Sequence, residues 1–369
     1  MFVKLELLPK NARIVVGFSG GADSRALLDI LVHHAQENHW YIIAAYLDHQ
    51  WRAESATEAL WCKQVAEHYH IPYQTMTLQH VVEQTKILPS STHSKESYAR
   101  SVRHAFYALV ADKHMAEYIA LAHHQGDQEE TFFIRLIRGS GLEGLCAIQE
   151  TSRLHSANFI RLYTPDITNN AIGLHNQKTF CACKNGPCHN LLVVRPLLHV
   201  TKQELVTYNN EHNLTWLEDP TNQDLSILRN CIRKTVLPSL HACDDRFGKS
   251  FQRTLQHLQE AQDYIDFCTT QTLQSITTTD TQQCRWIDIR TLLLLHPTLQ
   301  HSVIIAWFSR EKISFVPSKA FFNEIMRFFK QRTSGSHQLG LDWKISCAQN
   351  KATITSGCIS GLCPRPARP

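Results

Sequence analysis

The stretch RIVVGFSGGADS, residues 13–24, decides the fold of this chain. Residues 13–18 form a short β-branched run that is typical of a buried strand, and residues 24–32 are apolar with a helical pattern. Gly20 and Gly21 lie between the two. A strand, a glycine turn and a helix in this order bring backbone N–H groups and a helix dipole to one point, which favours binding of an anion such as phosphate.

The same alternation continues along the chain. Further strands are predicted at residues 41–49, 72–78, 118–124 and 191–198, and further helices at residues 55–70 and 97–113. Alternating strands and helices predict an α/β fold with a doubly wound, mostly parallel sheet. Binding sites on such sheets lie at the carboxyl ends of the strands. The candidate residues at those ends are the glycine turn, Asp48-His49 and His123-His124.

Composition and length set the domain organisation. The 369 residues are 43% hydrophobic and 19% charged, with a net charge of +4, so a packed protein of two or three domains is expected. We expect a catalytic domain over residues 1–240 with an inserted loop at about 165–190. A mainly helical domain follows at 245–335, and a short remnant with a disordered tail at 336–369. Neither a membrane-spanning run nor a signal peptide is present, which predicts a cytoplasmic protein without a membrane partner.

The glycine turn differs from the common phosphate loops. It lacks the Gly-Lys-Ser/Thr ending of the P-loop and is one residue short of the dinucleotide pattern. The glycines let the backbone approach a ligand, the serines offer hydroxyls, and Asp23 could hold a magnesium ion. An ordinary turn between strand and helix is the alternative. The predicted phosphate-binding residues are Ser19, Gly20, Gly21, Ala22, Asp23 and Ser24.

Two carboxylates are predicted to share one face of a helix that begins near Gln125. Asp127 and Glu130 are three residues apart, and such a pair can hold a cationic amine or a metal ion. An exposed acidic helix start is the alternative. Glu129 fits that alternative better, because it points away from the shared face.

Several segments in one order resemble a known family. The sequence Ser-Gly-Gly-x-Asp-Ser is similar to the pyrophosphate loop of the ATP pyrophosphatases, which split ATP into AMP and pyrophosphate. Within this group the chain most resembles the tRNA(Ile)-lysidine synthetases, and the resemblance covers residues 13 to about 240. The segments that narrow it are LDHQWRAES (47–55), SYARSVRHAFY (97–107), AHHQGDQEETFFIRLIRGSGLEGL (122–145), RPLL (195–198) and LTWLEDPTNQDLSILRNCIRKTVLPSL (214–240).

This resemblance implies a reaction and its substrates. Members of the family use ATP and Mg²⁺ to adenylate the C2 oxygen of the wobble cytidine of the isoleucine tRNA with a CAU anticodon. The ε-amine of L-lysine then attacks C2 and expels AMP. No obligatory protein partner is expected. The resemblance adds Asp48 and His123 to the ATP site and assigns lysine binding or catalysis to Asp127, Glu130 and Arg229.

Arginine pairs are further candidates for contacts with phosphate or tRNA. Members of each pair are three or four residues apart, so they lie on one helix face. For Arg100, Arg103, Arg135 and Arg138 the alternative is ordinary surface charge. For Arg229 and Arg233 the alternative is a structural role that clasps their helix to the sheet domain. The predicted contacts are Arg100, Arg103, Arg135, Arg138 and Arg233.

Two departures from the family pattern stand out. The usual histidine motif is His-His-x-Asp-Asp, and Gly126 replaces the first aspartate here. We expect activity to survive, with altered magnesium binding. The resemblance also fades over residues 336–355, where longer members add a tRNA-binding domain, so the chain resembles a short form with tRNA affinity in question.

The predicted insertion contains a cysteine cluster, Cys181, Cys183, Cys188 and His189. Its spacing is not a regular zinc pattern, so a reduced loop is favoured over a metal site. Cysteines also raise the alternative of a tRNA thiolase from the same superfamily, although no C-x-x-C motif occurs in the chain. A further alternative is an RNA-binding relative that has lost ligase activity.

Overall fold

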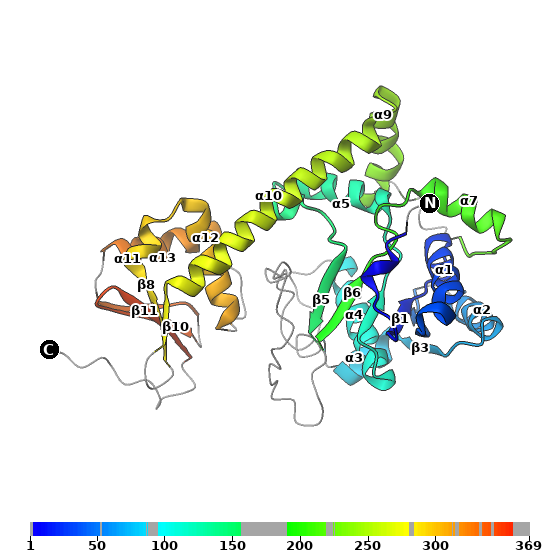
Figure 1. Ribbon diagram of the computed structural model, residues 1–369, viewed down its shortest axis with the longest axis horizontal. Helices are drawn as coiled ribbons and strands as arrows, with labels where there is room; N and C mark the ends of the chain where they lie inside the picture. The colour runs from blue at the N-terminus through cyan, green and yellow to red at the C-terminus, as the bar shows by residue number, and fades with distance from the viewer. Residues whose placement is uncertain are drawn as a thin grey trace. The chain divides into compact units, whose positions relative to one another are not determined.

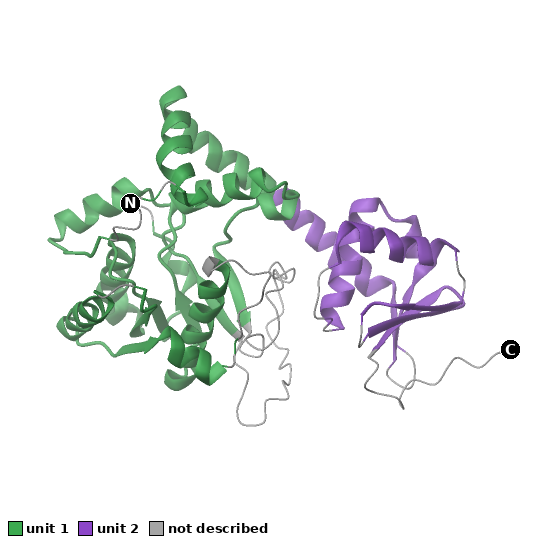
Figure 2. Cartoon of the chain, turned by 180° about the vertical axis from the view of Figure 1, so that it is seen from behind, with its two compact units in different colours: residues 1–163, 176–259 green, residues 164–175, 260–369 purple. Residues whose placement is uncertain are grey.

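The structure is a computed structural model, and it describes residues 3–51, 54–85, 87, 95–155, 190–218, 224, 226–279, 284–311, 313, 317–331, 334–340 and 343–356. The predicted insertion lies outside these residues except for residue 190, and so does the tail from residue 357. The chain folds into two compact units (Figure 2). They divide between residues 259 and 260, within helix α10 (Phe247–Ser275).

The first unit is built on a six-stranded sheet with the strand order β3-β2-β1-β4-β6-β5 (Figure 1). All neighbouring strands are parallel except β5, which runs antiparallel to β6. The prediction of an α/β, mostly parallel, doubly wound sheet is confirmed. The strands are β1 (Arg13–Gly17), β2 (Tyr41–Asp48), β3 (Tyr73–Thr77), β4 (Tyr118–Ala120), β5 (Thr151–His155) and β6 (Asn190–Val194).

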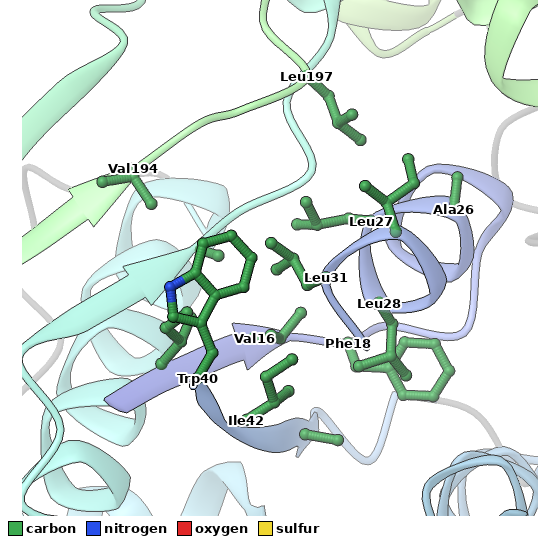
Figure 3. Close-up of a cluster of buried hydrophobic side chains, with 14 of the residues drawn as sticks. Val16, Phe18, Ala26, Leu27, Leu28, Leu31, Trp40, Ile42, Val194 and Leu197 are labelled. Carbon is green, nitrogen blue, oxygen red and sulfur yellow. The ribbon is translucent and has the colours of Figure 1, made fainter. Parts of the chain in front are cut away.

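Helices cover both faces of this sheet because apolar side chains along the central strands alternate between two cores. Ile14 and Val16 pack with α1 (Ala22–Asn38), α2 (Ser55–His68) and α7 (Lys202–Glu211) in one core, part of which is drawn in Figure 3. Val15 packs on the other face with α3 (Leu78–Thr85) and α4 (Lys95–His114). The continuous apolar runs in the sequence follow from burial on both faces.

The strand order reverses between β1 and β4. From β1 the chain moves outward through β2 and β3, and it then returns to place β4 on the opposite side of β1. Ligands bind outside the carboxyl ends of the strands at such a point. The glycine turn follows β1 here, and α5 (Gln125–Ile137) follows β4.

Short helices complete the first unit beyond this point. Phe132 and Phe133 of α5 pack against Phe251 and Leu255 of α10, together with Ala147. The remaining elements are η1 (Leu5–Leu7), α6 (Leu142–Leu145), α8 (Leu228–Cys231), the π-helical turn η4 (Ile232–Val236) and α9 (Leu237–Cys243).

The second unit combines helices with a small sheet. Its helices are the end of α10, α11 (Ile289–Leu294), α12 (Pro297–Arg310) and α13 (Lys319–Gln331). Its antiparallel sheet has the order β7-β8-β11-β10-β9, with β7 (Thr277–Thr279), β8 (Arg285–Asp288), β9 (Gly335–Gln338), β10 (Trp343–Ala348) and β11 (Lys351–Ser356). Trp307 and Ile345 are buried in its core.

This sheet was not expected from the sequence. A mainly helical domain was predicted, and residues 336–355 were interpreted as a short remnant. The structure instead forms the strands β9, β10 and β11 in this region, because Ile345 and Cys347 alternate with more exposed neighbours and pack in the core of the second unit. In the described part of the chain, every helix falls short of the length and apolarity needed to cross a membrane.

Candidate functional site

The turn between β1 and α1 has the form of an anion-binding loop. Gly20 has a φ of +82°, and a Cβ there would lie 2.8 Å from the Leu217 side chain, so both conformation and space require glycine. Ser24 Oγ accepts a hydrogen bond from the Ser19 N–H at 3.2 Å and donates one to the Gly21 carbonyl at 2.9 Å. Gly21 is the N-cap of α1 and provides no capping side chain. The first N–H groups of α1 therefore remain available to a ligand.

His124 joins this loop to α5. It caps the helix, because its Nδ1 accepts from the Gly126 N–H at 3.0 Å while its own N–H donates to Asp127 Oδ2 at 3.0 Å. Its Nε2 faces Asp23 Oδ2 at 3.8 Å and Asp127 Oδ2 at 3.7 Å. A Cβ on Gly126 would lie 2.8 Å from the His124 ring. The glycine that departs from the family pattern thus gives the histidine room to cap the helix.

An acid–arginine cluster fills the next turn of α5. Glu130 is buried, and its Oε2 accepts from Arg229 Nε at 2.6 Å and from Arg233 Nη2 at 3.1 Å. Arg229 Nη2 also donates to Asp127 Oδ1 at 2.7 Å. The fork from α8 and η4 thus contacts both carboxylates. It has the clasping geometry that was the alternative interpretation of this arginine pair.

Asp127 is ionised at neutral pH because its surroundings lower its pKa. Burial alone raises its pKa, but His124, His123 and Arg229 outweigh burial and bring the pKa to about 2. The pKa of His123 falls to about 3, because it is buried and lies near Arg195. The site at neutral pH therefore holds a carboxylate beside a neutral imidazole.

Asp23 of the phosphate loop and Glu130 and Arg233 of the cluster line one pocket of about 310 Å³, whereas Asp127 and Arg229 are not among its lining residues. Lys202, the first residue of α7, donates to Asp23 Oδ1 at 2.7 Å and closes one side. Glu129 is buried here, contrary to its interpretation as part of an exposed helix start. The lining residues are Asp23, His124, Gly126, Glu129, Glu130, Lys202, Arg233, Leu237, Pro238 and His241.

Lys202, Glu129 and His241 were not among the predicted site residues. A signal for Lys202 exists in the sequence, because Thr201 and Glu204 form a capping box that starts a helix just after a strand end. Glu129 accepts from Gln125 Nε2 at 2.9 Å and lies 3.4 Å from His241 Nε2. His241 comes from α9. No local pattern in the sequence joins residues 129 and 241.

The other predicted residues lie around this pocket or apart from it. Asp48 Oδ1 accepts from the Gln50 N–H at 2.8 Å and shapes the turn after β2. Arg135 donates to the Gly144 and Ala147 carbonyls and so holds α6 against α5. Among the predicted arginines, Arg100, Arg103 and Arg138 are exposed.

Metal ligands are sparse within the described ranges, where no three His, Cys, Asp or Glu side chains gather to hold a metal. Asp23 can contribute one carboxylate to a magnesium ion, which usually takes its other ligands from substrate phosphates and water. Its partly exposed side chain fits that role. The cysteine cluster at residues 181–189 lies outside the described residues.

Residues 2–240 match the PP-loop domain family. The chain belongs to the PP-loop family. It is 27% identical over 308 residues to the tRNA(Ile)-lysidine synthase of Francisella tularensis subsp. novicida, covering 84% of this chain and 65% of that protein. It is 30% identical over 350 residues to the tRNA(Ile)-lysidine synthase of Bacillus cereus, covering 93% and 66%. This PP-loop chain thus spans about 65% of the length of these relatives. The family resemblance seen in its sequence is confirmed.

A solved structure of another protein has a similar fold. The U34-tRNA thiolase NcsA from Methanococcus maripaludis, with its [4Fe-4S] cluster, superposes with a TM-score of 0.50 at 16% identity. The match covers 70% of this chain and 75% of the thiolase. At that identity the similarity concerns the fold alone.

Proposed function

We propose that this protein is a cytoplasmic tRNA(Ile)-lysidine synthetase. It would ligate L-lysine to C2 of the wobble cytidine of the isoleucine tRNA with a CAU anticodon, consuming ATP and releasing AMP and pyrophosphate. The modified tRNA would then read AUA codons as isoleucine. The observation that supports the proposal is a pocket lined by Asp23 of the phosphate loop and by Glu130, whose partner Arg229 also binds Asp127.

The residues of the site would serve different steps of this reaction. The N–H groups at the start of α1 receive the ATP phosphates, and Lys202 adds a positive charge at the same edge. The α-phosphate is transferred to the C2 oxygen of the cytidine, and pyrophosphate leaves. The ε-amine of lysine then forms a bond to C2, and the bond between C2 and the adenylated oxygen breaks to release AMP.

Asp127 and Glu130 would bind the amine through their negative charge and orient it toward C2, and its protons would pass to solvent. Arg229 keeps both carboxylates in place, and the low pKa of Asp127 keeps it ionised at neutral pH. Asp23 would hold a magnesium ion, which supplies charge neutralisation on the phosphates when it is bound.

The thiolase alternative has less support. Cys62 lies beside the phosphate loop, with its Sγ 3.2 Å from where a Cβ on Gly20 would be. Burial raises the pKa of this thiol to about 12, so it is not available as a thiolate at neutral pH. Sulfur transfer would require a different cysteine.

Incorporation of radiolabelled lysine tests the proposal. The substrate is unmodified isoleucine tRNA with a CAU anticodon, supplied with ATP and magnesium, and the variants are Asp23→Ala and Asp112→Ala. Asp112 is an exposed carboxylate on α4 and serves as the matched control. We expect label with the wild type and with Asp112→Ala, and loss of at least about 100-fold with Asp23→Ala. No label with folded wild type contradicts the proposal, and sulfur transfer is then assayed.

A further inference from the structure

The turn after β2 presents an exposed aromatic side chain at the carboxyl edge of the sheet. Trp51 is 66% exposed, and its indole stacks on the His49 imidazole with ring centroids 4.8 Å apart and planes at 30°. The turn is shaped by the Asp48 side chain and by Gln50, whose φ of 55° is left-handed. A large flat surface is therefore open to solvent on a fixed turn.

Arg103 holds the imidazole under the indole. Its Nη2 lies 3.3 Å from His49 Nε2. Burial and the nearby Arg103 lower the pKa of His49 to about 4, so the ring is neutral at pH 7 and Nε2 can accept from the guanidinium. The result is a stack of indole and neutral imidazole with a cation at its edge.

The helix that contacts this stack carries a second exposed arginine. Arg100 and Arg103 are both exposed and lie three residues apart on α4. The Asp48 carboxylate at the end of β2 opposes the effect of Arg103 and raises the pKa of His49. A ligand on the indole would therefore lie close to Arg103, with the positive charge of Arg100 on the same helix face.

We propose that Trp51, His49, Arg100 and Arg103 form a docking surface for an unpaired RNA base and its phosphate. Exposed aromatic rings beside arginines bind single-stranded RNA because every base has a flat face and every nucleotide carries a phosphate. The inference rests on the proposed function, since an anticodon loop supplies unpaired bases beside the cytidine that must reach the pocket. The occupant is a base of that loop next to the target.

Binding of RNA without turnover tests this surface. A fluorescent hairpin with the anticodon stem and loop of the CAU tRNA is titrated with wild type, Trp51→Ala, Trp51→Phe and Met115→Ala. Met115 is the matched control, because it is 64% exposed and precedes β4, so it lies at the opposite edge of the sheet. ATP affinity of each variant is measured by calorimetry in parallel.

We expect Trp51→Ala to weaken hairpin binding by about 10- to 100-fold. Trp51→Phe should retain most of the affinity, and Met115→Ala all of it, with ATP affinity unchanged throughout. A hairpin with the same stem closed by a tight four-residue loop should bind all four proteins equally weakly. Unchanged hairpin affinity in Trp51→Ala overturns the proposal, and so does a loss confined to ATP, which would assign the indole to the adenine ring.

The same data separate this inference from the proposed function. Hairpin binding that depends on Trp51, in a protein that incorporates no lysine, keeps the docking surface and removes the ligase. Lysine incorporation in a protein whose hairpin binding ignores Trp51 does the reverse.

Discussion

Two neighbouring glutamates in α5 have different surroundings. Glu130 is 1% exposed and lies between two guanidinium groups, whereas Glu129 is 4% exposed and contacts an amide and a histidine. Burying a carboxylate costs free energy unless a positive charge compensates it. When such a carboxylate is removed, the cations that it paired with are left uncompensated. The charge of Glu130 should therefore matter more to the fold and to the chemistry than that of Glu129.

Glu130→Gln is expected to lower the free energy of unfolding by about 1–3 kcal/mol and to abolish lysine incorporation. The reason is that Arg229 and Arg233 would face a neutral amide, although their partial exposure lets water offset part of the loss. Urea unfolding at pH 7 and the lysine assay measure the two effects. Glu129→Gln, the control, should lose less than about 1 kcal/mol; equal losses in both variants would contradict the argument.

Asp127 should make stability depend on pH in the acidic range. Its folded pKa of about 2 is below its ordinary value of 3.8, so its carboxylate stabilises the fold above about pH 4. That contribution, about 2 kcal/mol, disappears as pH falls through the folded pKa. The difference in unfolding free energy between wild type and Asp127→Asn should therefore be larger at pH 6 than at pH 3. Asp112→Asn provides the exposed control, and a difference that stays constant with pH would refute the expectation.

The sequence allowed the members of this cluster to be predicted, but not their contacts. Spacing put Asp127 and Glu130 on one helix face and Arg229 and Arg233 on another, and the structure agrees. That the two pairs meet depends on packing between α5 and the α8–η4 segment, about 100 residues later, which no local pattern encodes. The capping box predicts the helix that begins at Lys202, but the contact of Lys202 with Asp23, 179 residues away, depends on packing in the same way.

At the level of elements, the loop from β1 to α1 depends on one glycine conformation. Gly20 combines a positive φ with a tight approach to Leu217, while Gly21 has a φ of −70° and open space, its nearest contact being 3.7 Å from a Cβ. The Leu217 N–H also donates to the Gly20 carbonyl at 2.9 Å. The two glycines of the motif therefore have different structural requirements.

Gly20→Ala should destabilise the protein by about 1–3 kcal/mol, because a Cβ adds left-handed strain and overlaps the Leu217 side chain. Gly21→Ala should change the unfolding free energy by less than about 0.5 kcal/mol. Both variants are compared by urea unfolding without nucleotide, so the result is independent of ATP chemistry. A loss with Gly21→Ala as large as that with Gly20→Ala would show that neither backbone conformation nor space distinguishes the two sites.

Strands and helices of the first unit could be predicted because their apolar periods are long and local. The expected strands at 13–18 and 41–49 agree with β1 and β2 within one residue, and the helix expected at 97–113 agrees with α4 within two. The second sheet could not be predicted in the same way. Its strands have three to six residues, and β8 pairs with β11 some 60 residues away, so their stability depends on partners that are distant in sequence.

At the scale of the whole chain, each unit has a core of its own. Phe106 is fully buried among side chains of β1, β2 and α4 in the first unit. Trp307 is 1% exposed among α12, α13 and the small sheet in the second. Separate cores of this size favour separate unfolding, even though α10 runs through both units.

Calorimetry of the full chain should therefore show two transitions that respond to different substitutions. Phe106→Ala and Trp307→Ala each remove a buried ring and should each cost about 3–5 kcal/mol, but in different units. Trp307→Ala should lower the temperature of one transition. Its ATP affinity, measured at roughly 15 °C, should match that of the wild type, because the phosphate loop belongs to the first unit. Phe106→Ala should lower the other transition and weaken ATP binding. A single transition that both substitutions shift equally would mean that α10 couples the two cores into one cooperative unit.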